Sequence, residues 1–226
     1  MKKFIAIGFI LLAPWSLANN ARETVYQIES ASHRGDTQSL KSIETHGDQF
    51  ADAFRLYQLA SHATAKQAYR ESLNYLERAV PILEKQIEKE AQNADAHALL
   101  AAIYGWISGQ KPESATVYGP LSHQLIATAR EINGEDPQVN LLSGIIKFHT
   151  PEAYGGSKQE ALKLFGKAIT AYESAGDAGW GKADAYVWRA VILRDLGKTV
   201  RAQEDLTTAL NIDPEYGWAK FLRQSF

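Results

Sequence analysis

The tripeptide Gly197-Lys198-Thr199 has the ending of a phosphate-binding loop. In such a loop the lysine contacts the phosphates and the hydroxyl contacts the bound metal ion. The motif also needs a glycine five residues before Gly197, where this chain has Ile192, and a preceding β-strand, where the pattern here is helical. We therefore expect a turn between two helices at Gly197 and no nucleotide site.

Histidines could ligate a metal ion or transfer protons, but the six in this chain are scattered. No two are spaced i, i+4 and no His-Glu-x-x-His segment occurs, so the spacing gives no support for three or four converging zinc ligands. His149 stands beside Thr150-Pro151 and belongs either to a functional loop or to a helix end. The six are His33, His46, His62, His97, His123 and His149. We expect no metal ion.

Residues for covalent catalysis are also missing. The chain has no cysteine, which excludes the thiol hydrolases, and no serine lies in a Gly-x-Ser-x-Gly elbow. The carboxylates follow helix surfaces, and nothing marks a pair of them in an apolar cleft. The sequence therefore predicts a protein that is not an enzyme and has no cofactor.

Composition and charge further limit the partner class and the fold class that are expected. With 24 basic and 26 acidic residues the chain is weakly acidic and has no basic block, so we expect no nucleic-acid partner. Alanine, leucine, glutamate and lysine are abundant and β-branched runs are few, which predicts an almost wholly helical chain.

The N-terminus has the three parts of a secretory signal peptide. Met1-Lys2-Lys3 is positively charged, the segment from Phe4 to Leu12 is apolar, and small residues precede a cut between Ala18 and Asn19. A membrane anchor is the alternative, but a span needs about 20 apolar residues, and this run is shorter and broken by a proline. We expect a soluble periplasmic protein without a membrane span after cleavage, held together by packing alone.

The elements that must position any site are helices in a repeating pattern. Ala202 and Ala209 lie on one helix face and let a neighbouring helix approach, while Leu206 packs between them. The same spacing recurs at Ser72, Leu76 and Ala79, with helix-ending residues such as Pro214 between units. Expected helix N-caps are Asp36, Asp48 and Ser157.

This order of alanines, a central glycine turn and a terminal proline resembles the tetratricopeptide repeat, a helix-turn-helix of ~34 residues. The resemblance implies an all-α, α-α superhelix of about four divergent repeats with capping helices at both ends. In the middle repeats, extra residues are expected in inter-helix loops at 107–120 and 150–156. The predicted domains are a signal peptide (1–18), N-terminal capping helices (19–52), repeats (53–93, 94–136, 137–182 and 183–216, together 53–216) and a C-terminal cap (217–226).

For function, the resemblance implies a non-enzymatic interaction scaffold of the bacterial cell envelope that binds a peptide or helix of a protein partner in a concave groove. The first helix of each repeat would line this groove. By repeat register the groove residues are Tyr57, Ser61, Ala98, Ala102, Trp106, Ile145, Phe148, Asp184, Val187, Val191 and Arg194. The alternative is a small-molecule-binding accessory protein, for example of a transport system, with an enclosed pocket between the two long inter-helix loops.

Overall fold

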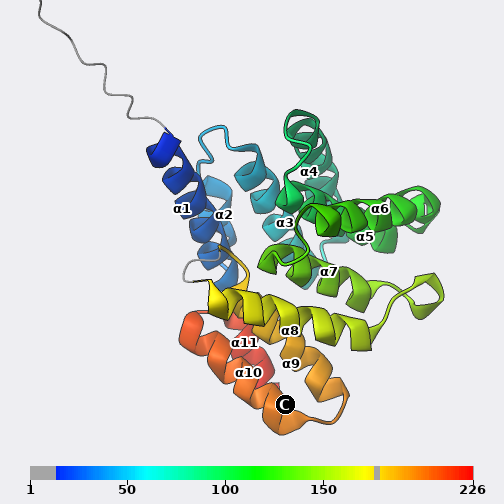
Figure 1. Cartoon of the computed structure of the whole chain (residues 1–226). Helices are drawn as coiled ribbons and strands as arrows, with labels where there is room; N and C mark the ends of the chain where they lie inside the picture. The colour runs from blue at the N-terminus through cyan, green and yellow to red at the C-terminus, as the bar shows by residue number, and fades with distance from the viewer. Residues whose placement is uncertain (1–13, 176–178, 226) are drawn as a thin grey trace, which may run out of the picture.

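The computed structural model describes residues 14–175 and 179–225. In these ranges the chain forms eleven α-helices, two short 3₁₀ turns and no strand (Figure 1). The predicted all-α class is confirmed. Most of the predicted signal peptide, residues 1–13, lies outside the described residues, and the expected cut between Ala18 and Asn19 falls within the first helix. No helix of the described ranges is long and apolar enough to cross a membrane.

Eight of the helices pair as antiparallel hairpins. They are α3 (Gln49–Ala65) with α4 (Tyr69–Lys89), α5 (Ala94–Gln110) with α6 (Ala115–Asn133), α7 (Pro137–His149) with α8 (Lys158–Ser174), and α9 (Lys182–Asp195) with α10 (Thr199–Ile212). Two helices precede the hairpins, α1 (Pro14–His33) and α2 (Thr37–Ser42), and α11 (Gly217–Ser225) follows them. The predicted division into domains stays a prediction.

Three helices begin at the N-cap residues that the sequence predicted. Asp36 accepts a hydrogen bond from the Ser39 amide at 3.0 Å, and Asp48 accepts one from the Ala51 amide at 3.0 Å. The Ser157 hydroxyl accepts from the Glu160 amide at 3.2 Å. Each cap satisfies one of the amides that the first helical turn leaves unpaired, which confirms the three predicted helix starts.

The small residues of the repeat pattern allow the close helix packing that was predicted. Ala202, Leu206 and Ala209 are all fully buried. At Gly144 in α7 the approach is closer still, because a Cβ there would lie 2.5 Å from Cε1 of Phe165 in α8. Small residues at these contacts therefore let the helices pack closely.

One of the two predicted insertion loops does not form. In the second hairpin α5 continues to Gln110 and α6 already begins at Ala115, so only Lys111 and the 3₁₀ turn η1 (Pro112–Ser114) separate them. The extra residues lengthen both helices, which pairs backbone groups that a long loop would leave to water. In the third hairpin the insertion does form a loop, with the 3₁₀ turn η2 (Glu152–Tyr154) followed by Gly155 at φ 88°.

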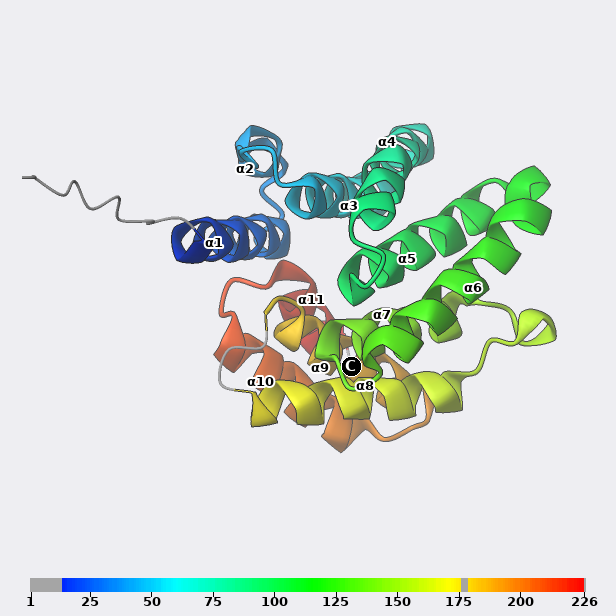
Figure 2. The ribbon, with the colours of Figure 1, turned by 45° about the horizontal axis from the view of Figure 1, so that its top comes forward.

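The stack curves until its two ends meet. The first helices of neighbouring hairpins contact each other from α3 to α5, α7 and α9, which places them on the inner side of the curve. Figure 2 shows α1 beside the C-terminal helices, and Phe54 of α3 contacts Trp180, just before α9, at 4.5 Å between ring centroids. The N-terminal helices therefore close the stack as well as capping its first hairpin.

Candidate functional site

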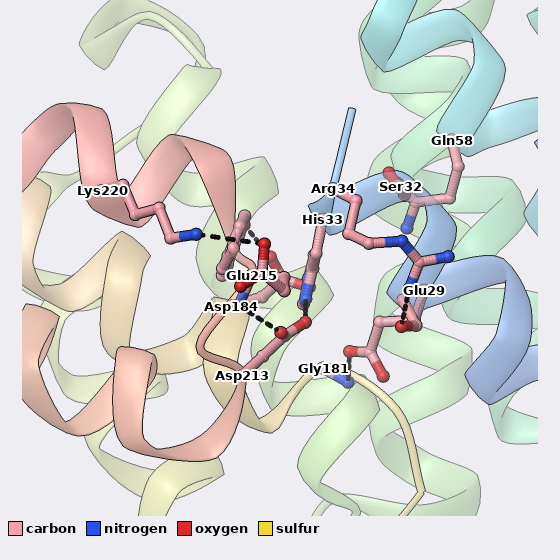
Figure 3. Close-up of polar contacts among 12 residues, drawn as sticks. Glu29, Ser32, His33, Arg34, Gln58, Gly181, Asp184, Asp213, Glu215 and Lys220 are labelled. Carbon is pink, nitrogen blue, oxygen red and sulfur yellow. Dashed lines mark hydrogen bonds and ion pairs between the residues drawn. The ribbon is translucent and has the colours of Figure 1, made fainter. Parts of the chain in front are cut away.

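A group of polar side chains lies where the two ends of the stack meet (Figure 3). His33, the last residue of α1, places Nδ1 2.8 Å from Oδ2 of Asp213, in the loop after α10. Its Nε2 lies 3.5 Å from Oδ2 of Asp184, in the first turn of α9. The His33 ring also stacks on Tyr216, with 3.7 Å between the ring centroids. One side chain of α1 therefore contacts three residues from the other end of the chain.

Glu29, one helical turn before His33, makes a further contact across this junction. Its Oε1 accepts a hydrogen bond from the backbone amide of Gly181 at 2.6 Å. Gly181 has φ 94°, and a Cβ there would lie 2.5 Å from Cδ2 of Leu141, so the position needs glycine. The Tyr216 hydroxyl donates to Oδ1 of Asp184. We call Glu29, His33, Asp184, Asp213 and Tyr216 the closure cluster.

Charge in the closure cluster is strongly perturbed by burial and by neighbours. Burial alone would lower the pKa of His33, but Asp184, Asp213 and Glu29 together raise that pKa to about 10. Burial raises the pKa of Glu29 to about 7, against the opposing effect of His33. The hydrogen bond from His33 lowers the pKa of Asp213. An imidazolium at His33 would therefore face three carboxyl groups.

An apolar contact adjoins the cluster. Phe54 and Phe50 of α3 both lie against Trp180, at 4.5 Å and 6.4 Å between ring centroids. Trp180 is 6% exposed and its carbonyl accepts a hydrogen bond from the hydroxyl of Tyr172. The junction thus combines a polar cluster with a buried aromatic contact.

The predicted groove residues fall into different environments. Ala98, Ala102, Val187 and Val191 are buried in helix packing and leave a partner almost no surface to contact. Ser61 and Arg194 are exposed, and Nη2 of Arg194 lies 3.4 Å from Oδ1 of Asp195. Asp184 belongs to the closure cluster.

The rest of the predicted groove consists of three half-buried aromatic residues and Ile145. The rings of Tyr57 and Trp106 meet edge to face, with 5.4 Å between their centroids. Ile145 and Phe148 are half-buried, and Phe148 lies 5.6 Å from Trp188, which in turn lies 4.9 Å from Trp218. We call Phe148, Trp188 and Trp218 the aromatic strip. The structure thus brings Tyr57 together with Trp106, and Phe148 together with two tryptophans outside the predicted groove. The groove assignment stays a prediction.

The closure cluster was not predicted from the sequence. Glu29 and His33 stand i, i+4 on one helix, which puts them on one face. Their partner Asp184 is 151 residues from His33, so no local spacing connects them. The sequence alone could show only that Glu29 and His33 share a helix face.

Two hollows on the described residues are open depressions. One follows the exposed face of α10 and is lined by Thr199, Val200, Gln203, Glu204, Thr207 and Thr208. The other lies between α1 and α2, with Tyr26, Ser30 and Ile43 in its lining. Neither lies between the loop segments 107–120 and 150–156, where the small-molecule alternative placed its pocket.

Comparison with known proteins bears on the fold. A thermophilic tetratricopeptide-repeat protein of Thermus thermophilus, TTC0263, is similar over 92% of this chain and 97% of its own, at 15% identity and a TM-score of 0.58. A structure described as MamA from AMB-1 covers 86% of this chain and 98% of its own, at 13% identity and a TM-score of 0.38. No family model and no curated protein matches the chain. The first likeness shows a fold of the tetratricopeptide type, as the sequence predicted.

Proposed function

We propose that this tetratricopeptide-type stack is a non-enzymatic scaffold of the bacterial cell envelope that binds a protein or peptide partner on the inner side of its curve. The observation that carries the proposal is the set of half-buried aromatic side chains on the inner helices. Trp106 lies on α5, Phe148 on α7 and Trp188 on α9. Tryptophan and arginine supply much of the binding energy at protein interfaces, because each combines a large contact area with directional polar groups.

Two regions of this inner side are the candidate contacts. One is the edge-to-face pair of Tyr57 and Trp106, with exposed Ser61 one turn away on α3. The other is the aromatic strip, near the end of α9 that carries Arg194. A peptide or helix that lay against both regions would bury aromatic surface that the isolated protein leaves partly in water.

Support for the envelope location comes from the N-terminal sequence. A positive start, an apolar segment and small residues before Asn19 are the features of an exported chain. Cleavage after Ala18 would remove only the beginning of α1 and would keep Glu29 and His33, so the junction between the two ends would survive processing. We place the processed protein in the periplasm.

Neither the two hollows nor the turn between α5 and α6 favours the small-molecule alternative. A ligand pocket should be enclosed and mostly apolar, whereas the two hollows described above are open to solvent. The residues between α5 and α6 form a short turn in place of the long loop that this alternative required.

The test is capture of the partner by cross-linking in the native compartment, followed by affinity measurements with purified variants. Trp106→Ala and Arg194→Ala should each weaken capture by roughly thirtyfold, which corresponds to about 2 kcal/mol. Val200→Ala, a change at a 73% exposed residue of α10, is the control and should bind as the wild type does. N-terminal sequencing of the same preparation should return Asn19.

Two results would contradict the proposal. If the Trp106 and Arg194 variants retain helix content and melting temperature and still bind normally, the inner surface is not the binding site. If the protein is recovered on membranes with Met1 intact, the periplasmic location is wrong. Far-UV circular dichroism of each variant separates loss of binding from loss of folding, and exposed Arg194 is the change that should least disturb the fold.

A further inference from the structure

Three potential metal ligands converge in the closure cluster. Glu29, His33 and Asp184 each offer one ligand atom, and these atoms all lie within 4.8 Å of one another (Figure 3). Glu29 and His33 come from successive turns of α1, and Asp184 comes from the first turn of α9. The three side chains therefore meet only because the stack closes on itself.

The separation of two of these atoms suits a shared metal ion as well as the ion pair that they form without one. Nε2 of His33 and Oδ2 of Asp184 are 3.5 Å apart, at the upper limit for a hydrogen bond. Two ligands that bind one tetrahedral zinc ion at about 2.0–2.2 Å lie about 3.3–3.5 Å from each other. The pair already has that spacing.

Each of the three side chains also makes a hydrogen bond to a residue outside the trio. Nδ1 of His33 meets Asp213 at 2.8 Å, so a metal ion that displaced the proton from Nε2 would bind a ring already held in place. Oδ1 of Asp184 accepts from Tyr216, and Oε1 of Glu29 accepts from Gly181. A carboxylate behind a metal-ligating histidine is the usual way to fix its tautomer and ring orientation.

The charge balance of the cluster also favours a cation. Three carboxyl groups, from Glu29, Asp184 and Asp213, surround one histidine whose side chain is 5% exposed. The positive charge of Arg34 also lowers the pKa of Asp213. Buried charges are costly unless they are paired or bind an ion, and a divalent cation that replaced the proton on Nε2 of His33 would offset more of this negative charge than the proton does.

We propose that Glu29, His33 and Asp184 bind a divalent transition-metal ion of the zinc class, which fastens α1 to α9. One imidazole nitrogen and two carboxylate oxygens suit zinc, whereas calcium takes six to eight oxygen ligands. Three protein ligands leave a fourth position for water or for a group of a partner. The metal site is independent of the proposed scaffold function, because it rests on the junction alone.

The test is titration of metal-free purified protein with ZnCl₂, followed by calorimetry and by thermal unfolding. The wild type should bind one zinc ion per chain, with a rise in melting temperature. Glu29→Gln and Asp184→Asn should abolish this rise, while Asp213→Asn should weaken binding by roughly 10- to 100-fold. His123→Ala, at an exposed residue of α6, is the matched control and should bind zinc normally. MgCl₂ should leave the melting temperature unchanged.

Nuclear magnetic resonance of the histidine rings keeps the test decisive if a variant unfolds. In the wild type, zinc should shift the ring resonances of His33 and leave the other five histidines unchanged. Absence of saturable binding, an unchanged His33 ring, or folded Glu29 and Asp184 variants that bind as the wild type does would overturn the metal site. The closure cluster would then be an ion-paired contact only.

Discussion

At the residue scale, Asp95 is a carboxyl group whose burial changes its pKa. It lies in the first turn of α5, and its Oδ1 is buried without a hydrogen-bond partner. Burial raises its pKa to about 7, and the nearby charge of Asp136 adds to the effect. The helix N-terminus partly offsets the cost of this carboxylate, since the helix dipole favours negative charge there.

A pH-dependent loss of stability follows from this shift. The folded chain keeps the Asp95 proton up to about pH 7, whereas the unfolded chain loses it near the ordinary value of 3.8. Between these values the folded state binds more protons, so stability falls as the pH rises. Asp95→Asn should unfold like the wild type near pH 4 and be more stable at pH 8, by on the order of 2 kcal/mol.

Urea unfolding at both pH values measures this difference. Glu135→Gln, at an exposed residue, is the control and should change stability little at either pH. An Asp95→Asn variant with the same stability as the wild type at pH 8 would mean that the carboxylate is better solvated than the structure indicates.

At the scale of elements, contact between α7 and α8 depends on the absence of one methyl group. Gly144 faces the ring of Phe165, which is fully buried, and an added Cβ would approach Cε1 to 2.5 Å. Gly166, the next residue of α8 after Phe165, has no such neighbour, because nothing lies within 4 Å of the position that a Cβ would take there. An added methyl group would therefore clash at Gly144 but not at Gly166.

The two glycines make a matched pair of substitutions. Gly144→Ala should lower the free energy of unfolding by roughly 1–3 kcal/mol, because the helices must separate or Phe165 must move. Gly166→Ala should raise it by about 0.5–1 kcal/mol, because alanine loses less backbone entropy in a helix. Chemical denaturation of both variants gives the two signs. Equal effects would contradict the close packing of α7 on α8.

At the scale of the whole molecule, the two ends of the stack meet. In an open stack, Phe54 of α3 and Trp180 before α9 would be at different positions along the superhelix, whereas here their rings meet at 4.5 Å. The polar cluster next to this contact joins the same two ends. This junction fixes the two ends of the stack relative to each other.

A double-mutant cycle tests the closure in solution. Phe54→Ala and Trp180→Ala should be coupled by about 0.5–1.5 kcal/mol, because an aromatic pair contributes this much beyond its buried area. The control cycle combines Phe54→Ala with Leu206→Ala in the last hairpin, and it should be additive within roughly 0.5 kcal/mol. Additivity in the first cycle would show that the ends do not meet.

Local features followed from the sequence because short-range contacts encode them. Asp36, Asp48 and Ser157 cap helices as predicted, since a cap needs only an oxygen and an amide two or three residues later. Gly197 forms the expected turn between α9 and α10 at φ 72°, a conformation that glycine adopts without strain. The small residues at fixed spacing likewise predicted helix hairpins and their stacking.

The tertiary structure alone decided whether the extra residues of the second hairpin extend its helices and whether the stack closes. Gly119 and Pro120 are typical loop residues, but both lie in α6, because packing of α6 on α5 outweighs their weak helix preference. Closure sums the small rotations between successive hairpins, and no single segment encodes that sum. His33 and Asp184, 151 residues apart, therefore had no pattern in common until the curve of the stack brought them together.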